Sequence, residues 1–164
     1  MSLYDHIETC NVHSFDDKMP FRVGGRQVGW VGENVASRMT RWDHYFEITD
    51  NSVDILESLN DVESRSKALA EAGAALVVQQ ALPRNRKELC SVTEKFGGEG
   101  LMRIDRAWLE SFGVISYGVH VNGYVQTAAG PELWIGVRSK NRGVAPGKLD
   151  NMVAGGLPVS TSLA

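Results

Sequence analysis

The sequence has only two cysteines, no long hydrophobic run and no excess of positive charge. Cys10 and Cys90 form no CxxC pair and are too few for a disulfide scaffold. A membrane span needs roughly 20 consecutive apolar residues, and no run approaches that length. The 17 Lys and Arg against 20 Asp and Glu give a net charge of −3, which supplies no general field for a nucleic acid backbone. Because the N-terminus also lacks a basic segment followed by an apolar one, we expect a cytoplasmic protein with neither membrane nor nucleic acid as partner.

The composition is that of a globular protein, with 43% hydrophobic and 23% charged residues in a chain of 164. Local patterns predict an α+β fold with mixed sheets. The segment before Phe21 is expected to be a short helix or arm. Two short strands between Phe21 and Trp30 should meet at the Gly24-Gly25 turn, because glycine adopts the positive φ that such turns require.

Further elements follow from hydrophobic spacing and turn residues. The longest helix is predicted over Val62 to Ala81, with Asn60 or Asp61 as N-cap and Gly73 as a weak point inside it. Before it we expect a brief helix at Glu33 to Met39 and a strand pair at Tyr45 to Thr49 and Val53 to Leu56. After it we expect a strand at Glu88 to Phe96, a turn at Gly97 to Gly100 and a short helix at Ile104 to Phe112.

The strongest strand pattern covers Gly113 to Gln126. Valines and other apolar residues alternate there with polar ones, which predicts one packed face and one polar face that carries His120 and Asn122. A turn at Thr127 to Pro131 should lead to an antiparallel partner at Leu133 to Val137, although Asn122-Gly123 is itself a hairpin signal.

Three candidate sites rest on few residues. His6, Cys10 and His13 are potential zinc ligands within one short segment, but their spacing does not provide four closed ligands, and exposed histidines on an arm are the favoured interpretation. His120 and Asn122 could point into one cleft, or they could be ordinary polar residues of a sheet. Cys90 lies among apolar residues, which favours a buried structural thiol over a nucleophile.

A fourth candidate is the segment from Leu133 to Gly156, which concentrates positive charge beside glycines in an otherwise acidic chain. Cationic side chains next to exposed backbone amides suit a phosphate or pyrophosphate ligand. A solvated loop is the alternative. The cations are Arg138, Lys140, Arg142 and Lys148.

Specific motifs in this region resemble the opening of a Nudix (MutT-like) hydrolase domain. The similarity is greatest to the subgroup related to thiamine pyrophosphokinase, whose Nudix domain follows an N-terminal domain of unknown function. The matching segments are a strand at Phe112 to Val119 continuing through Tyr124, a tryptophan-bearing strand at Trp134 to Ser139, a turn at Pro146 to Asn151, and Val153 to Gly156. The earlier chain also looks like the N-terminal domain of that subgroup, including Pro20-Phe21, Gly29, Arg65 to Leu69 and the expected helix at Ile104 to Phe112.

The resemblance implies an N-terminal domain at residues 1–111 and the first part of a Nudix domain at residues 112–164. It implies hydrolysis of a small-molecule diphosphate to a monophosphate, with Mg²⁺ or Mn²⁺ as cofactor and with thiamine diphosphate or its oxidised analogues as candidate substrates. Basic side chains would hold the phosphates while bound metal activates water. Arg138, Lys148, His120 and Asn122 are then the substrate-binding candidates, and the backbone of Gly155 and Gly156 is a candidate metal ligand.

The sequence departs from the Nudix pattern after Gly156. The signature box should continue into a helix that carries glutamates, but the chain ends at Ala164, and Ser162 stands where the box often has its first glutamate. No catalytic residue is therefore expected among these 164, and the uncovered strands should leave an apolar face. We expect the N-terminal portion of a longer enzyme. The alternative is a non-catalytic diphosphate-binding or interaction module, with homodimerisation as one way to cover the strands.

Overall fold

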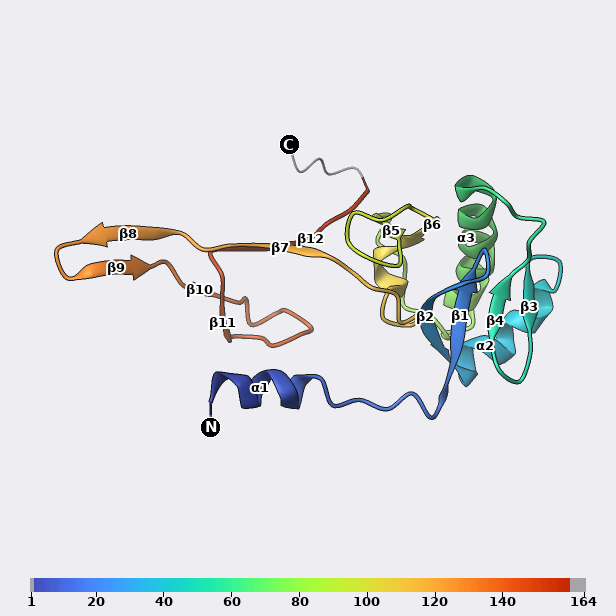
Figure 1. Ribbon diagram of the computed structural model, residues 1–164, viewed down its shortest axis with the longest axis horizontal. Coiled ribbons are helices and arrows are strands. Elements are labelled where there is room, and N and C mark those ends of the chain that lie inside the picture. The colour runs from blue at the N-terminus through green and yellow to red at the C-terminus, as the bar shows by residue number, and fades with distance from the viewer. Residues whose placement is uncertain (1, 160–164) are drawn as a thin grey trace. The chain divides into compact units, whose positions relative to one another are not determined.

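The computed structural model describes residues 2–159 and contains two compact units (Figure 1). The first unit extends to Ile115 and the second begins at Ser116. The boundary expected from the sequence fell before residue 112. In the structure Phe112 and Val114 are buried in the core of the first unit, which places the division of the two units later in the chain. Ser162, which stands where the Nudix box often has its first glutamate, lies outside the described residues.

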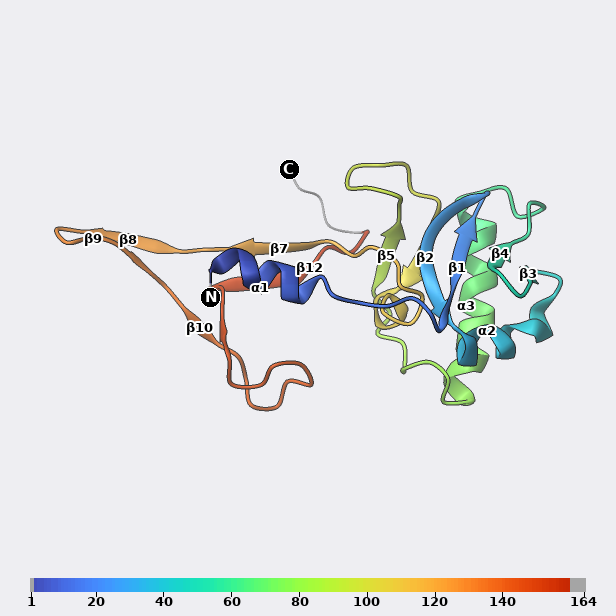
Figure 2. The ribbon, with the colours of Figure 1, turned by 60° about the horizontal axis from the view of Figure 1, so that its bottom comes forward.

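A four-stranded sheet in the order β2-β1-β4-β3 organises the first unit. Strands β1 (Lys18–Val23) and β2 (Arg26–Gly32) form the predicted antiparallel hairpin, with positive φ angles of 57° at Gly24 and 73° at Gly25. Strand β4 (Val53–Ile55) runs parallel to β1 and antiparallel to β3 (Phe46–Ile48) (Figure 2). These elements confirm the predicted hairpin and strand pair.

The predicted helices before residue 81 are also present. They are α1 (Leu3–Cys10), α2 (Glu33–Met39) and α3 (Val62–Val78). A 3₁₀ turn η1 (Thr40–Trp42), which was not predicted, follows α2. Asp61 caps α3 by accepting from the backbone N–H groups of Glu63 and Ser64. Helix α3 ends before the predicted Ala81, because Gln79 is its C-cap and Gln80 turns the chain with a φ of 58°.

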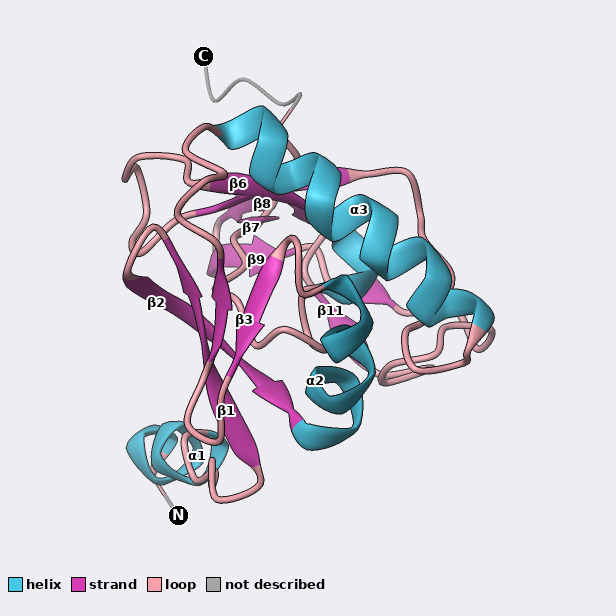
Figure 3. Ribbon diagram, turned by 90° about the vertical axis from the view of Figure 1, so that its right-hand side faces the viewer, coloured by secondary structure: helices cyan, strands magenta, loops and turns pink. Residues whose placement is uncertain are grey.

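A second, two-stranded sheet lies against α3 (Figure 3). Strand β5 (Leu89–Val92) pairs antiparallel with β6 (Met102–Asp105), and a 3₁₀ turn η2 (Arg106–Trp108) follows. The predicted helix over Ile104 to Phe112 is therefore wrong in its first residues. Ile104 pairs with Cys90 across the sheet, so long-range pairing overrides the helical spacing of the apolar residues.

The core of the first unit contains residues of the sheet, of helices α2 and α3, and of the β5–β6 pair. Gly29 shows how closely β2 meets the end of this unit, because a Cβ built there would lie 2.2 Å from the carbonyl oxygen of Phe112. The backbone N–H of Trp30 donates to that same oxygen at 2.9 Å. The largest fully buried side chains are Phe21, Phe46, Phe112, Met39, Leu69, Leu76, Met102 and Ile104.

Three antiparallel strand pairs make up the second unit. They are β7 (Gly118–Val121) with β12 (Val153–Gly156), β8 (Tyr124–Thr127) with β9 (Gly130–Leu133), and β10 (Gly136–Val137) with β11 (Leu149–Asp150). The preferred turn after Thr127 is confirmed, but the partner predicted at Leu133 to Val137 is wrong, because β8 pairs with Gly130–Leu133 while Gly136–Val137 pairs with β11.

The continuous strand predicted over Gly113 to Gln126 is wrong. The chain changes partner at Asn122-Gly123, where the carbonyl of Gly123 accepts from the N–H of Trp134 at 2.9 Å. The predicted packed face is also wrong within this unit, since no described residue from 116 to 159 is buried. Val119, Val121 and Val125 are 40%, 42% and 46% exposed, so the apolar strand residues are uncovered, as the resemblance implied. No helix in the described part of the chain is both long enough and apolar enough to cross a bilayer.

Candidate functional site

Two of the predicted site residues are linked through a third in the second unit. The β7–β12 pairing sets His120 opposite Ala154 and brings it close to Asn151, which precedes β12. The Nδ1 atom of His120 lies 2.7 Å from Oδ1 of Asn151, and the Asn151 amide donates to Oδ1 of Asn122. With its amide group used as donor toward Asn122, Asn151 offers oxygen to the histidine. This arrangement suits donation from Nδ1 of His120 to the Asn151 oxygen.

Arg138 lies at the base of the neighbouring loop and is held by Asp150. Its Nη1 donates to Oδ2 of Asp150 at 2.6 Å, and its Nε donates to the carbonyl of Val144 at 3.3 Å. The other Asp150 oxygen accepts from the Asn151 N–H at 2.9 Å. These bonds lower the pKa of Asp150, the Asn151 N–H first and Arg138 next, with smaller attractions to Arg138 and His120. Asp150 and Asn151 thus join the arginine to the histidine in one polar network.

The loop between β10 and β11 is closed by its own backbone. The N–H of Arg138 donates to the carbonyl of Lys148 at 2.9 Å, and the N–H of Gly147 donates to the carbonyl of Arg138 at 3.1 Å. Gly147 has a φ of 70°, a conformation that glycine adopts without strain. The side chains of Lys140, Arg142 and Lys148 are exposed and take part in no ion pair among residues 2–159. The loop therefore carries three cations without an ion pair among the described residues, whereas its fourth cation, Arg138, is paired with Asp150.

Gly155 and Gly156 lie in β12, opposite Val119 and Gly118. The described residues contain no group of three or more His, Cys, Asp or Glu side chains that could hold a metal ion, at these glycines or elsewhere. The same holds for His6, Cys10 and His13, which are exposed on or just after α1. Cys90 is buried, as predicted, and burial raises the pKa of its thiol.

Sequence reasoning missed the two residues that organise the site. Asp150 and Asn151 were recognised only as part of a turn motif. Their roles depend on the β10–β11 register, which pairs Gly136 with Asp150 and so brings Arg138 near the carboxylate. The sequence did offer one signal for this site, which is an acidic residue, Asp150, placed between a basic loop and an asparagine.

Comparison with known proteins agrees with the two units. Residues 2–116 match a family described as a domain of unknown function, DUF4743. Two proteins of Arabidopsis thaliana, named "Nudix hydrolase 24, chloroplastic" and "Nudix hydrolase 20, chloroplastic", are 31% and 32% identical over 97% and 94% of this chain. An uncharacterized protein of Saccharomyces cerevisiae is 26% identical over 81% of the chain.

The chain belongs to the DUF4743 family, and it is related to Nudix hydrolases through residues that extend beyond that domain. The resemblance noted from the sequence is thereby confirmed. The chain spans less than half the length of these relatives, 45%, 44% and 41% respectively. Both plant relatives are named as chloroplastic, which is said of those proteins, and the cytoplasmic location expected for this chain stays a prediction.

Proposed function

We propose that this chain is part of a Nudix-type pyrophosphohydrolase and that its second unit holds the diphosphate of a small-molecule substrate. The observation that carries the proposal is the closed loop from Arg138 to Lys148, which presents unpaired cations beside backbone turns. Cationic side chains are what a diphosphate requires for binding. Similarity to Nudix hydrolases over nearly the whole chain supports the same assignment.

Each site residue then has a distinct role. Lys148 contacts phosphate oxygens directly, since no described acidic residue competes for its ammonium group. Arg138 binds phosphate through the donors that Asp150 and Val144 leave free, and it also fixes the loop. His120 offers Nε2 to the substrate while Asn151 and Asn122 hold its ring.

The Mg²⁺ or Mn²⁺ implied by the relationship does not fit the described residues, which supply no acidic cluster for it. We therefore derive no catalytic step from this chain. The backbone of Gly155 and Gly156 stays a proposed contributor to a metal site whose carboxylates would come from other residues. Thiamine diphosphate and its oxidised analogues are the proposed substrates, with the monophosphate as product, because the sequence motifs are closest to that Nudix subgroup.

Calorimetric titration of the 164-residue chain with thiamine diphosphate tests the binding role. Lys148→Ala should weaken binding by about tenfold, the loss expected for a charged hydrogen bond. Lys95→Ala removes an exposed lysine of the first unit and should leave affinity unchanged. Equal affinity for the Lys148 variant and the unaltered chain would show that the loop does not hold the diphosphate.

A non-catalytic binding or interaction module is the second candidate, favoured by the lack of a described metal cluster and by the exposed strands. Chromatographic detection of thiamine monophosphate, with Mg²⁺ present and with protein isolated from its natural source, separates the two. Product formation supports the hydrolase. Binding without product, together with a dimer in sedimentation, supports the module.

A further inference from the structure

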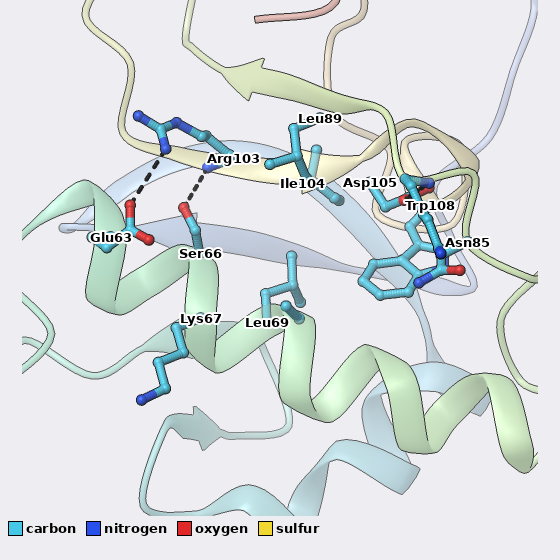
Figure 4. Close-up of a pocket in the computed structure, with 12 residues that line it drawn as sticks. Glu63, Ser66, Lys67, Leu69, Asn85, Leu89, Arg103, Ile104, Asp105 and Trp108 are labelled. Atoms are coloured by element: carbon cyan, nitrogen blue, oxygen red, sulfur yellow. Dashed lines mark hydrogen bonds and ion pairs between the residues drawn. The ribbon is translucent and has the colours of Figure 1, made fainter.

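A pocket of about 480 Å³ lies in the first unit, between α3 and the β5–β6 pair (Figure 4). Its size falls within the roughly 300–1,000 Å³ of small-molecule sites. Leu69, Ile104 and Trp108 are buried and form an apolar floor, and Leu89 adds an exposed apolar side chain. The lining residues all belong to the matched domain of unknown function, so the pocket is separate from the loop at Arg138 to Lys148.

The acidic groups of this pocket are already bound. Glu63 pairs with Arg103 at 3.3 Å. The buried carboxylate of Asp105 accepts from the backbone N–H groups of Lys87 at 2.9 Å and Arg86 at 3.0 and 3.2 Å, and also from that of Ala107 at 2.9 Å. These carboxylates therefore offer little to a cation.

The donors, in contrast, are largely free. Lys67, Lys87 and Asn85 line the pocket, and their side chains have no hydrogen-bond or ion-pair partner among the described residues. Arg103 uses one guanidinium nitrogen on Glu63 and keeps its remaining donors. Because exposed ion pairs are worth about 0–1 kcal/mol, an incoming anion can share this arginine readily.

Lys87 is held at the pocket edge by an unusual backbone. Its φ of 59° lies in the left-handed region, which is unfavourable for a residue with a Cβ. The Asp105 carboxylate, bound to the Lys87 N–H, stabilises this conformation from within the fold. Strained backbone that the surroundings hold in place is found often at binding sites.

We propose that this pocket binds a small phosphate monoester with an apolar body. Arg103 and Lys87 favour an anionic head group, whereas the Lys67 ammonium points away from the other labelled residues (Figure 4). The floor of Leu69, Ile104 and Trp108 favours an apolar remainder. Asp105 acts as a positioning residue that sets the place of Lys87.

Phenyl phosphate is the probe, titrated into ¹⁵N-labelled chain while the assigned Trp108 indole N–H signal is followed by NMR. This group donates to the carbonyl of Pro83 at 3.0 Å, at the edge of the pocket. Phenyl phosphate should bind at least about tenfold more tightly than either inorganic phosphate or phenol, since only the ester uses both cations and floor. Inorganic phosphate binding as tightly as the ester would overturn the proposal.

Two variants test the named cations. Lys87→Asn removes the charge but keeps a residue that tolerates positive φ, and Arg103→Gln removes the guanidinium. Each should weaken phenyl phosphate about fivefold or more while the dispersed amide spectrum is retained. Lys95→Ala and Lys148→Ala should have no effect on the Trp108 signal. If Lys148→Ala abolishes binding and the pocket variants do not, the ester binds the second unit and the pocket proposal is wrong.

Discussion

Replacing Gly73 with alanine tests how α3 packs on the β5–β6 side of the first unit. Gly73 lies inside α3 and is buried. A Cβ at this position would lie 2.4 Å from Cζ3 and 2.5 Å from Cη2 of Trp108. Carbon atoms in contact prefer separations of about 3.5–4.0 Å, so the added methyl group overlaps the indole ring.

The sign of the effect depends on two opposing contributions. Alanine should favour the helix by about 1 kcal/mol relative to glycine. Overpacking a buried site typically destabilises by about 1–3 kcal/mol. The overlap favours the upper end of that range, because Trp108 is only 3% exposed and is bound through Nε1 to the carbonyl of Pro83 at 3.0 Å. We therefore expect Gly73→Ala to lower the free energy of unfolding by about 2 kcal/mol.

Urea unfolding followed by far-UV circular dichroism measures this change. Ala74→Gly, at an exposed position of the same helix, should lower the free energy of unfolding by about 1 kcal/mol, and it measures the difference in helix propensity without any packing effect. In a Trp108→Phe background, which removes the overlapping ring atoms, Gly73→Ala should destabilise less. A Gly73→Ala chain as stable as the unaltered one would refute the packing argument.

Three further predictions concern other groups of the first unit. Asp105→Asn should destabilise by about 1–3 kcal/mol in urea unfolding, because one amide oxygen cannot accept all the N–H bonds that the carboxylate accepts. Hydrogen bonds to the α3 N-terminus, those of Ser64 first, lower the pKa of Asp61 below its ordinary value of 3.8. The stabilisation from this cap is therefore fully present above pH 3.8 and is lost as the pH falls through the folded pKa. Asp61→Ala should lower the thermal midpoint at neutral pH and reduce its acid dependence. A thiol reagent should label exposed Cys10 quickly and Cys90 only slowly until the chain is unfolded; two fast thiols would contradict the burial of Cys90.

Local chemistry made much of the first unit predictable. Gly24-Gly25 specified its turn, and Asp61 specified the start of α3, since both act through their nearest neighbours. Ile104 was misplaced because its spacing from Trp108 suits a helix, while pairing with Cys90 makes it part of a strand. That pairing joins segments separated by the Gly97 to Gly100 turn, and its register cannot be read from either segment alone.

The candidate site was predictable in residue type but not in arrangement. The concentration of cations around Arg138 and the polar positions of His120 and Asn122 were visible in the sequence. The connection between them was not, because it runs through Asp150 and Asn151 and depends on two strand registers at once. The same registers explain why Arg138 is paired with Asp150, whereas Lys148 has no ion-pair partner among the described residues.

The strands of the second unit show how a sequence pattern can point to packing that its own residues do not supply. Alternation of Val119, Val121 and Val125 with polar residues is typical of a strand with one covered face. Yet these valines stay exposed, and no described residue of this unit is buried. Isolated strand pairs are marginally stable in water, so the pattern requires a covering layer from outside residues 116–159. In the hydrolase proposal that layer consists of further residues of a longer protein, and in the module proposal a second copy provides it. The state of association of the purified chain therefore helps to distinguish the two functions.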